Sequence, residues 1–344
     1  MILFLKKHKI LAGLAIFFLT FDIAVAALAV IPSGNDVISP GGLNTVQSVI
    51  DVESEVTLKG SFYTTYVYSM ERVSLLQELI ARLSNYNEIS PSSQTIVLSN
   101  VDNRLSGEIQ KQQSIEASLI CAYEAAKKKD NSVNLDYSFT GYIVYTHQVN
   151  HDVFKVGDII TAVNDIDNSD KYELADSINN LKIGDKIKYV RGVELLEHIV
   201  EEDFKTNKRM FYCYSKYQIE NQTASPSFTL YNPKSSGPSG GLMQTLSIYS
   251  QITGKDYTYG RKIAGTGTIN VNGDVGIIGG IGQKIVTAIY NGADVFLCPS
   301  ANYAEALEAY NKTIGHNKMV LIEVNTFSEA VNALEELYEV NWKI

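Results

Sequence analysis

Two short stretches of this sequence carry residue types that could perform covalent chemistry. The first is Gly-Pro-Ser-Gly-Gly at residues 237–241, in which Ser239 directly precedes an apolar run, residues 242–252, spaced as in a buried helix. A hydroxyl at a helix start lies near unpaired backbone N–H groups, which stabilise an oxyanion. The alternative interpretation is that Ser239 only caps the helix. Taken alone, the motif leaves both roles open.

The second stretch is rich in glycine and runs from Gly265 to Lys284. It lacks the Gly-Lys-Ser/Thr ending of a phosphate-binding loop, and its glycines do not follow the dinucleotide-binding spacing. We predict instead a hairpin that turns at Asn272-Gly273 and a helix that begins near Gly282. Lys284 would then lie in the first helical turn, which disfavours a cation, and burial there would make the amine lose its proton more easily.

The elements that must position these residues are predicted from apolar periodicity. Residues 46–68 are rich in β-branched and aromatic side chains on both sides of Lys59-Gly60, which predicts a hairpin. Residues 74–83 and 109–126 repeat apolar side chains at helical spacing. We therefore expect strands and helices on both sides of the middle of the chain to contribute to one fold.

A different unit is predicted to begin near Val133. Its elements are strands at 142–145, 159–163 and 186–190 and a helix at 172–181. The run VGDIITAVND, the helix and IGDKIKYVRG resemble PDZ domains, which bind a peptide as an added strand. The matching groove would be formed by Gly141, Tyr142, Ile143 and Val144. The alternative is a small β domain that only packs on its neighbour.

The N-terminal region contains an apolar run of 22 residues, residues 10–31, which is long enough to cross a bilayer. Lysines precede this run at positions 6, 7 and 9, and no Lys or Arg follows until Lys59. The positive-inside tendency therefore predicts a cytoplasmic N-terminus and a catalytic part outside the cytoplasm. A cleaved signal peptide is the alternative, because Ala24-Val25-Ala26 is typical of a cleavage site.

Composition excludes several other classes of function. The 344 residues carry a net charge of −9, which opposes binding to a nucleic acid. The three cysteines form no CxxC pair and no even disulfide set, so we expect neither a zinc knuckle nor a disulfide framework. His147 and His151 lack an evident third ligand, and we interpret them as surface histidines rather than a metal site.

The chemistry-bearing motifs become specific when they are combined. The serine motif, the turn Gly265-Thr266-Gly267 and the sequence Gly-Gly-Ile-Gly-Gln-Lys follow in this order, with Ser239 and Lys284 45 positions apart. Together they resemble the proteolytic domain of Lon, a peptidase with a Ser/Lys dyad, from about residue 222 to the C-terminal helices. Gly240 stands in place of the alanine that is usual in Lon, and Thr268 replaces a glutamate.

The resemblance implies a role for each of these residues. Ser239 would be the nucleophile and Lys284 its general base, Thr266 would orient Lys284, and N–H groups at Ser239 and near Gly237 would bind the oxyanion. A lysine with the reference pKa of ~10.4 is neutral only about once in 2,500 molecules at pH 7. Burial among isoleucines 277, 278, 281 and 285 would supply the necessary decrease in pKa.

The order of the segments resembles the bacterial membrane-anchored PDZ-containing Lon-like serine peptidases. This resemblance implies an α/β (α+β) protein: a Lon-type proteolytic domain with an inserted PDZ-like β domain and an N-terminal transmembrane helix. The expected parts are a cytoplasmic stub and anchor (1–31), a hairpin and helices that pack on the protease domain (32–130), the PDZ-like domain (131–204) and the Lon-like domain (205–344). Because the last part is short for a Lon proteolytic domain, strands at about 46–68 should complete it.

The expected activity is that of a cell-membrane, single-pass serine endopeptidase with its catalytic part outside the cytoplasm. It would act without ATP or another cofactor, since no Walker A sequence precedes the Lon-like region. The expected partners are peptides or unfolded proteins, and the chain could form a homo-oligomer. The alternative function is a noncatalytic PDZ/Lon-like scaffold that binds peptides.

Overall fold

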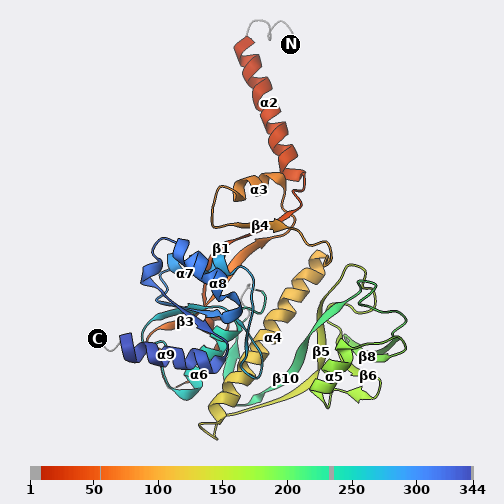
Figure 1. Ribbon diagram of the computed structural model, residues 1–344, viewed down its shortest axis with the longest axis vertical. Helices are drawn as coiled ribbons and strands as arrows, with labels where there is room; N and C mark the ends of the chain where they lie inside the picture. The colour runs from red at the N-terminus through yellow and green to blue at the C-terminus, as the bar shows by residue number, and fades with distance from the viewer. Residues whose placement is uncertain (1–8, 55, 232–235, 342–344) are drawn as a thin grey trace. The chain divides into compact units, whose positions relative to one another are not determined.

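The computed structural model describes residues 9–54, 56–231 and 236–341. The chain divides into two compact units (Figure 1). The smaller unit comprises residues 1–41 and 67–92, and the larger comprises residues 42–66 and 93–344. In this division residues 131–204, which are expected to form the PDZ-like domain, belong to the same unit as residues 205–344.

The smaller unit contains the apolar N-terminal helix. This helix, α2 (Lys9–Val30), has no buried side chain and is long and apolar enough to cross a membrane. The same unit contains the short helix α3 (Leu75–Ala81), whose N-terminus is closed by a capping box between Ser74 and Gln77. Strands β1 (Asn35–Thr45) and β4 (Glu88–Pro91) pair antiparallel, and the apolar core of this unit is Val37, Val73 and Ala81.

The central sheet of the larger unit is parallel. Strands β16 (Val320–Val324), β15 (Val295–Pro299), β12 (Lys262–Gly265) and β3 (Ser61–Met70) lie side by side in this order. Every residue of β15 is buried, as expected for a parallel strand covered on both faces. Strand β3 thus brings residues 61–64 next to residues 262–265.

The hairpin predicted over residues 46–68 is wrong. A short 3₁₀ turn (Val46–Ser48) leads into β2 (Ile50–Val52), which pairs with β11 (Phe228–Leu230) rather than with β3. Gly60 ends a longer connection instead of forming a tight turn: its N–H donates to Thr258 Oγ1, and a Cβ would lie 2.2 Å from the carbonyl oxygen of Arg261. Close packing on a distant loop therefore replaces local strand pairing.

Helices surround this sheet within the larger unit. The predicted helix at 109–126 is confirmed, but α4 (Asn100–Lys127) begins nine residues earlier, at a cap formed by Ser99. It packs against α6 (Gly241–Thr253), and the two share a core that includes Leu119, Leu242 and Leu246. The remaining helices are α7 (Ile281–Tyr290), α8 (Tyr303–Lys312) and α9 (Phe327–Asn341), and short 3₁₀ turns occupy Ser300–Asn302 and His316–Lys318.

The predicted turn at Asn272-Gly273 is confirmed. Strands β13 (Thr268–Ile269) and β14 (Val275–Gly276) pair antiparallel on either side of it. Gly273 has a φ of +90°, and its N–H donates to the carbonyl of Asn270 at 3.0 Å. The ladder is shorter than predicted, because residues 262–265 belong to the parallel sheet instead.

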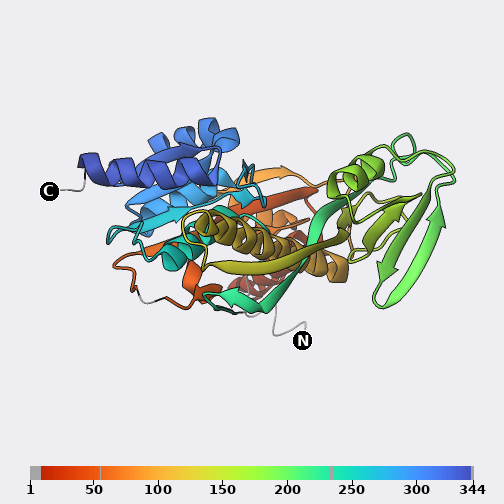
Figure 2. The ribbon, with the colours of Figure 1, turned by 90° about the horizontal axis from the view of Figure 1, so that it is seen from below.

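A second sheet occupies the region predicted to be PDZ-like. Its order is β10-β5-β6-β8-β9, with β7 beside β6. The strands are β5 (Asn134–His147), β6 (Ile159–Val163), β7 (Ile166–Asp167), β8 (Lys186–Arg191), β9 (Glu194–Ile199) and β10 (Phe211–Ser225), and the helix is α5 (Lys171–Asn179). This sheet has its own core around Phe154 and Leu174. The far ends of β5 and β10 join the main core instead, through Leu135 and Tyr217, and Figure 2 shows both strands running along α4.

Candidate active site

Ser239 lies on the turn that opens α6, two residues before the first helical residue. Its carbonyl oxygen accepts hydrogen bonds from Thr266 Oγ1 at 3.0 Å and from Gly267 N at 2.8 Å. A Cβ on the neighbouring Gly240 would lie 3.0 Å from the methyl group of Thr64. The glycine that replaces the expected alanine therefore lets the serine turn approach strand β3 closely.

Lys284 lies in the first turn of α7, as predicted. Its side chain is 3% exposed, and burial lowers its pKa to about 7. Ile281 and Ile285 are fully buried beside it on the same helix, whereas Ile277 is 64% exposed and does not contribute to the burial. Among the residues that the structure describes, Lys284 has no carboxylate partner, so desolvation acts on its ammonium without compensation.

Thr266 connects the two residues. Its hydroxyl is fully buried, donates its proton to the Ser239 carbonyl and accepts a hydrogen bond from Lys284 Nζ at 3.0 Å. Because a hydroxyl has one proton, Lys284 must supply an N–H to this contact. The lone pair of a neutral Lys284 then points away from Thr266 and is free to accept another proton. In the described part of the chain no hydrogen bond joins Nζ directly to Ser239 Oγ.

The backbone N–H groups around the serine differ in availability. The N–H of Gly237 donates to the carbonyl of Gly107 on α4 at 3.1 Å, so it is occupied in this arrangement. The N–H groups of Ser239 and Gly240 have no acceptor among the described residues. They are the better placed oxyanion donors, and a role for Gly237 requires that its bond to α4 opens.

Helix α4 also holds the serine turn from the other side. Ser114 Oγ donates to the Pro238 carbonyl at 2.9 Å and lies beside Gly241. The sequence does not predict this contact, because Ser114 lies 124 positions before Pro238. Apolar spacing predicts the helix that contains Ser114 but not what the helix contacts. The available signal was three polar residues within four positions of the predicted helix, Gln113, Ser114 and Glu116, all of which are buried in the structure.

The predicted peptide-binding strand has no free edge. Residues 141–144 pair with β10 on one side, where Gly141 opposes Lys216 and Val144 opposes Cys213. On the other side Tyr142 and Ile143 pair with β6, and Val144 donates to the carbonyl of Asp158. A peptide could add at Gly141, Tyr142, Ile143 and Val144 only by displacing one of these strands. This corrects the expectation of an open groove there.

One of the two histidines also differs from expectation. His151 is 6% exposed, not a surface residue; its Nδ1 contacts the Arg209 carbonyl, and burial lowers its pKa to about 4. Its ring stacks on Phe154 inside the second sheet's core. In the described ranges no group of three or more His, Cys, Asp or Glu residues could hold a metal ion.

Comparison with known proteins agrees with this geometry. Residues 229–336 match the family model of the Lon protease (S16) C-terminal proteolytic domain. This part of the chain is a Lon-type proteolytic domain. Over 95 residues the chain is 35% identical to a Lon protease from Neorickettsia sennetsu; the match covers 28% of this chain and 11% of that protein. The chain thus spans about a tenth of the length of this curated relative.

The Lon-type domain contains some but not all of the residues that form the site. Ser239, Thr266 and Lys284 lie within the matched residues. Gly107 and Ser114, which hold the serine turn, lie on α4 outside the match. Residues 229–336 therefore form a domain of the serine protease type, and α4, which lies outside the match, contributes hydrogen bonds that hold its serine turn.

Proposed function

We propose that this protein is a serine endopeptidase in which Ser239 is the nucleophile and neutral Lys284 is the general base. The observation that carries the proposal is the buried amine of Lys284, which donates to Thr266 while Thr266 donates to the carbonyl of Ser239. This arrangement supports a base that is neutral near pH 7, as a Ser/Lys dyad requires.

The chemical steps follow from these roles. Ser239 Oγ attacks the peptide carbonyl, Lys284 Nζ takes the hydroxyl proton, and the N–H groups of Ser239 and Gly240 stabilise the oxyanion. The C–N bond then breaks, and the protonated Lys284 returns its proton to the leaving amine. Water deprotonated by the same amine hydrolyses the acyl-enzyme. Thr266 keeps one N–H of the lysine occupied, so that the lone pair faces the reaction.

We propose further that cleavage needs no nucleotide. The 344 residues contain no Gly-x-x-x-x-Gly-Lys-Ser/Thr sequence that could cradle ATP phosphates. Without an ATP-driven unfolding step, the substrates would be extended peptides or unfolded proteins.

The site of action in this proposal is outside the cytoplasm, with α2 as a single-pass anchor. Helix α2 spans 22 residues, or about 33 Å, which matches a hydrocarbon core of about 30 Å. Lysines at positions 6 and 7 precede it and Lys9 is its first residue, and this asymmetry supports a cytoplasmic N-terminus. A cleaved signal segment is the competing topology.

The test of this function is digestion of a peptide library by the purified full chain without nucleotide. Ser239→Ala and Lys284→Ala should each abolish cleavage, and the double variant should be no worse than either, because the two residues act as one unit. Ser236→Ala, which changes an exposed serine three positions away, is the matched control and should keep full activity. Full activity of Ser239→Ala would contradict the proposal, and peptide binding without any cleavage would favour the scaffold.

A further inference from the structure

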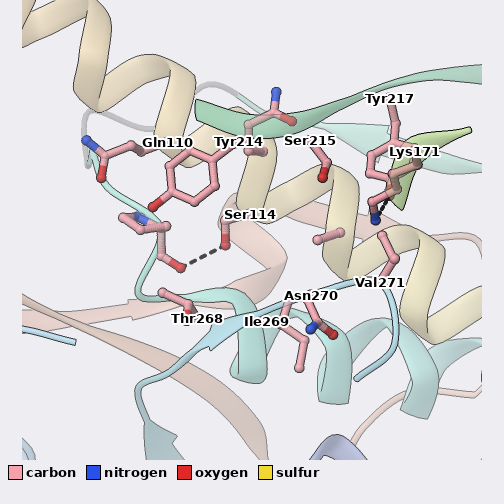
Figure 3. A pocket seen from close by; sticks show the side chains of 13 residues that line it. Gln110, Ser114, Lys171, Tyr214, Ser215, Tyr217, Thr268, Ile269, Asn270 and Val271 are labelled. Carbon is pink, nitrogen blue, oxygen red and sulfur yellow. Dashed lines mark hydrogen bonds between the residues drawn. The ribbon is translucent and has the colours of Figure 1, made fainter. Parts of the chain in front are cut away.

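A cavity of about 110 Å³ lies beside the serine turn in the larger unit (Figure 3). Pro238 lines it from the serine turn, and Ser114, bonded to the Pro238 carbonyl, lines it from α4. Lys171, the first residue of α5, lines the cavity from the second sheet's domain together with Tyr217. The cavity thus joins the Lon-type domain to a region outside the family match.

Two polar groups of this cavity could bind a ligand: a buried oxygen without a hydrogen-bond partner, and an ammonium without a carboxylate partner. Gln113 is 7% exposed, and its Oε1 has no hydrogen-bond partner among the described residues. An unpaired buried carbonyl oxygen is costly and accepts an N–H readily. Gln113 therefore marks a place where a ligand's N–H group would be stabilised.

The second group is the ammonium of Lys171. It donates to Tyr217 Oη at 2.6 Å, and the described residues offer it no carboxylate. Tyr217 does not neutralise it, because burial raises the pKa of this phenol to about 12. Among the described residues that line the cavity, Lys171 is the one that carries a charge, so this lining has an uncompensated positive charge.

The rest of the lining suits an aliphatic stem. Three residues contribute apolar surface to the lining: Ala117, Ile269 and Val271. Figure 3 labels Ile269 and Val271. An apolar wall, a carbonyl acceptor and a cation together complement a peptide that presents an N–H and a short side chain ending in a carboxylate.

We propose that this cavity is a substrate subsite that binds an acidic side chain of a peptide next to the bond cleaved at Ser239. The inference deepens the proposed peptidase function and rests on it for the cleavage, but the cavity can be tested by binding alone. Lys171 is the specificity-determining residue of this subsite, and Gln113 holds the peptide backbone there.

The experiment compares fluorogenic peptides that differ only by Glu or Gln at each position around one scissile bond, with the full chain in detergent. The wild type should prefer Glu at one position by at least about tenfold in kcat/KM, the size expected for a charge-assisted hydrogen bond. Lys171→Met should remove this preference, and Lys171→Arg should keep part of it. Lys182→Met is the matched control: Lys182 is an exposed lysine of the same domain and should leave the preference intact.

The outcomes separate the subsite from the peptidase function. If the wild type cleaves peptides with equal kcat/KM for Glu and Gln at every position, or if the preference survives Lys171→Met, the subsite is wrong and the peptidase stands. If no peptide is cleaved, the peptidase function fails, and fluorescence anisotropy with the same Glu and Gln peptides decides the subsite. A Glu preference in binding that depends on Lys171 supports it, and equal affinities overturn it.

A separate observation concerns the apolar surface of the smaller unit. Helix α3 and the residues just after it expose Leu79, Ile80 and Leu83 by 60%, 57% and 83%. The start of this helix is bonded to the end of α2, because Leu75 N donates to the Ile31 carbonyl at 2.9 Å. An apolar face attached directly to the end of a membrane-length helix is continuous with the lipid-facing surface of that helix.

We infer that these exposed leucine and isoleucine side chains at α3 lie in the lipid headgroup region. This inference rests on the proposal that α2 is an anchor. A Leu79→Trp variant in a Trp342→Phe background, reconstituted in phosphatidylcholine/phosphatidylglycerol vesicles, should be quenched by brominated lipid. Ile314→Trp in the same background, at an 81% exposed residue that belongs to the larger unit and not to the inferred surface, is the matched control probe. Quenching of the Leu79→Trp variant no stronger than that of the Ile314→Trp variant overturns the inference, while anchoring is checked separately by flotation of the vesicles.

Discussion

Replacing Lys284 by methionine should stabilise the protein while destroying its activity. The structure supplies the magnitude. Burial lowers the pKa of Lys284 from 10.5 to about 7, so burying this amine destabilises the folded state by about 4 kcal/mol at pH 7. Methionine has a similar length, packs on the buried Ile281 and Ile285, and carries no such cost.

The sign of the pH dependence is fixed by proton binding. Between pH 7 and 10.5 the unfolded chain holds a proton on Lys284 that the folded chain has lost, so the stability of the wild type rises with pH across this range. Lys284→Met lacks this term. Its advantage in free energy of unfolding should therefore be about 4 kcal/mol at pH 7 and fall to about 2 kcal/mol at pH 9.

Urea denaturation of the full chain in detergent at pH 7 and pH 9 measures both values. Lys182→Met, at an exposed lysine, is the control and should change stability by less than about 0.5 kcal/mol at either pH. An advantage of Lys284→Met that is equal at the two pH values, or a variant less stable than the wild type at pH 7, would refute the reasoning that burial sets the pKa.

Three further outcomes are expected. The kcat/KM for a peptide without titratable groups should rise with pH through about 7 and level off above it, because the neutral form of Lys284 is the active base; a rise that continues to pH 10 would contradict the burial effect. Thr266→Val should lower kcat/KM by about ten- to a hundredfold, since it loses the contacts to Lys284 and to the Ser239 carbonyl, and Thr266→Ser should restore most of the rate; equal rates in Thr266→Val and wild type would remove the orienting role. A protease added outside intact cells should digest the soluble part and leave a membrane-held stub that contains residues 9–30, whereas a mature chain that starts near Ala27 would show a cleaved signal.

Local patterns in the sequence predicted the helices near the site well. Lys284 falls in the first turn of α7 because the apolar spacing around Ile281 and Ile285 sets the helix and its buried face. The start of α4 could not be predicted from such a pattern. Residues 100–108 have little apolar periodicity, and the cap at Ser99 with packing further along the helix determines where it begins.

Long-range pairing could not be predicted in this way. Strand β2 pairs with β11, about 178 positions further along the chain, and nothing in the pattern of either segment identifies the other. The pairing of residues 141–144 with β10 is also long-range, and the local sequence pattern did not predict it. The proposed role of Thr266 was predicted from a resemblance alone; the two hydrogen bonds of its hydroxyl, to Ser239 and Lys284, are seen only in the structure.

The two cores of the larger unit suggest where the second sheet's domain can be removed. Deleting residues 133–200 would remove Val133 and Leu135, which are 4% and 5% exposed and belong to the core that contains Leu242 and Leu246 of α6. Each such loss costs about 2–5 kcal/mol, so this deletion should not fold. The domain's own core around Phe154 lies beyond the pair His147 and Phe211, at the end of the β5–β10 ladder.

A deletion that begins just after His147 and ends just before Phe211 should leave the proteolytic core intact. Gln148 N already donates to the Met210 carbonyl at 2.7 Å, so replacing residues 149–209 by Asn-Gly closes β5 and β10 into a hairpin. Val144→Thr and Phe211→Thr remove apolar side chains that lose their cover. This variant should unfold in one cooperative transition and still cleave a short neutral peptide, while cleavage of long substrates falls more steeply. Aggregation of this variant would show that the two cores are not separable at His147 and Phe211. Equally good folding of the 133–200 deletion would show that the core containing Leu242 and Leu246 does not need Val133 and Leu135.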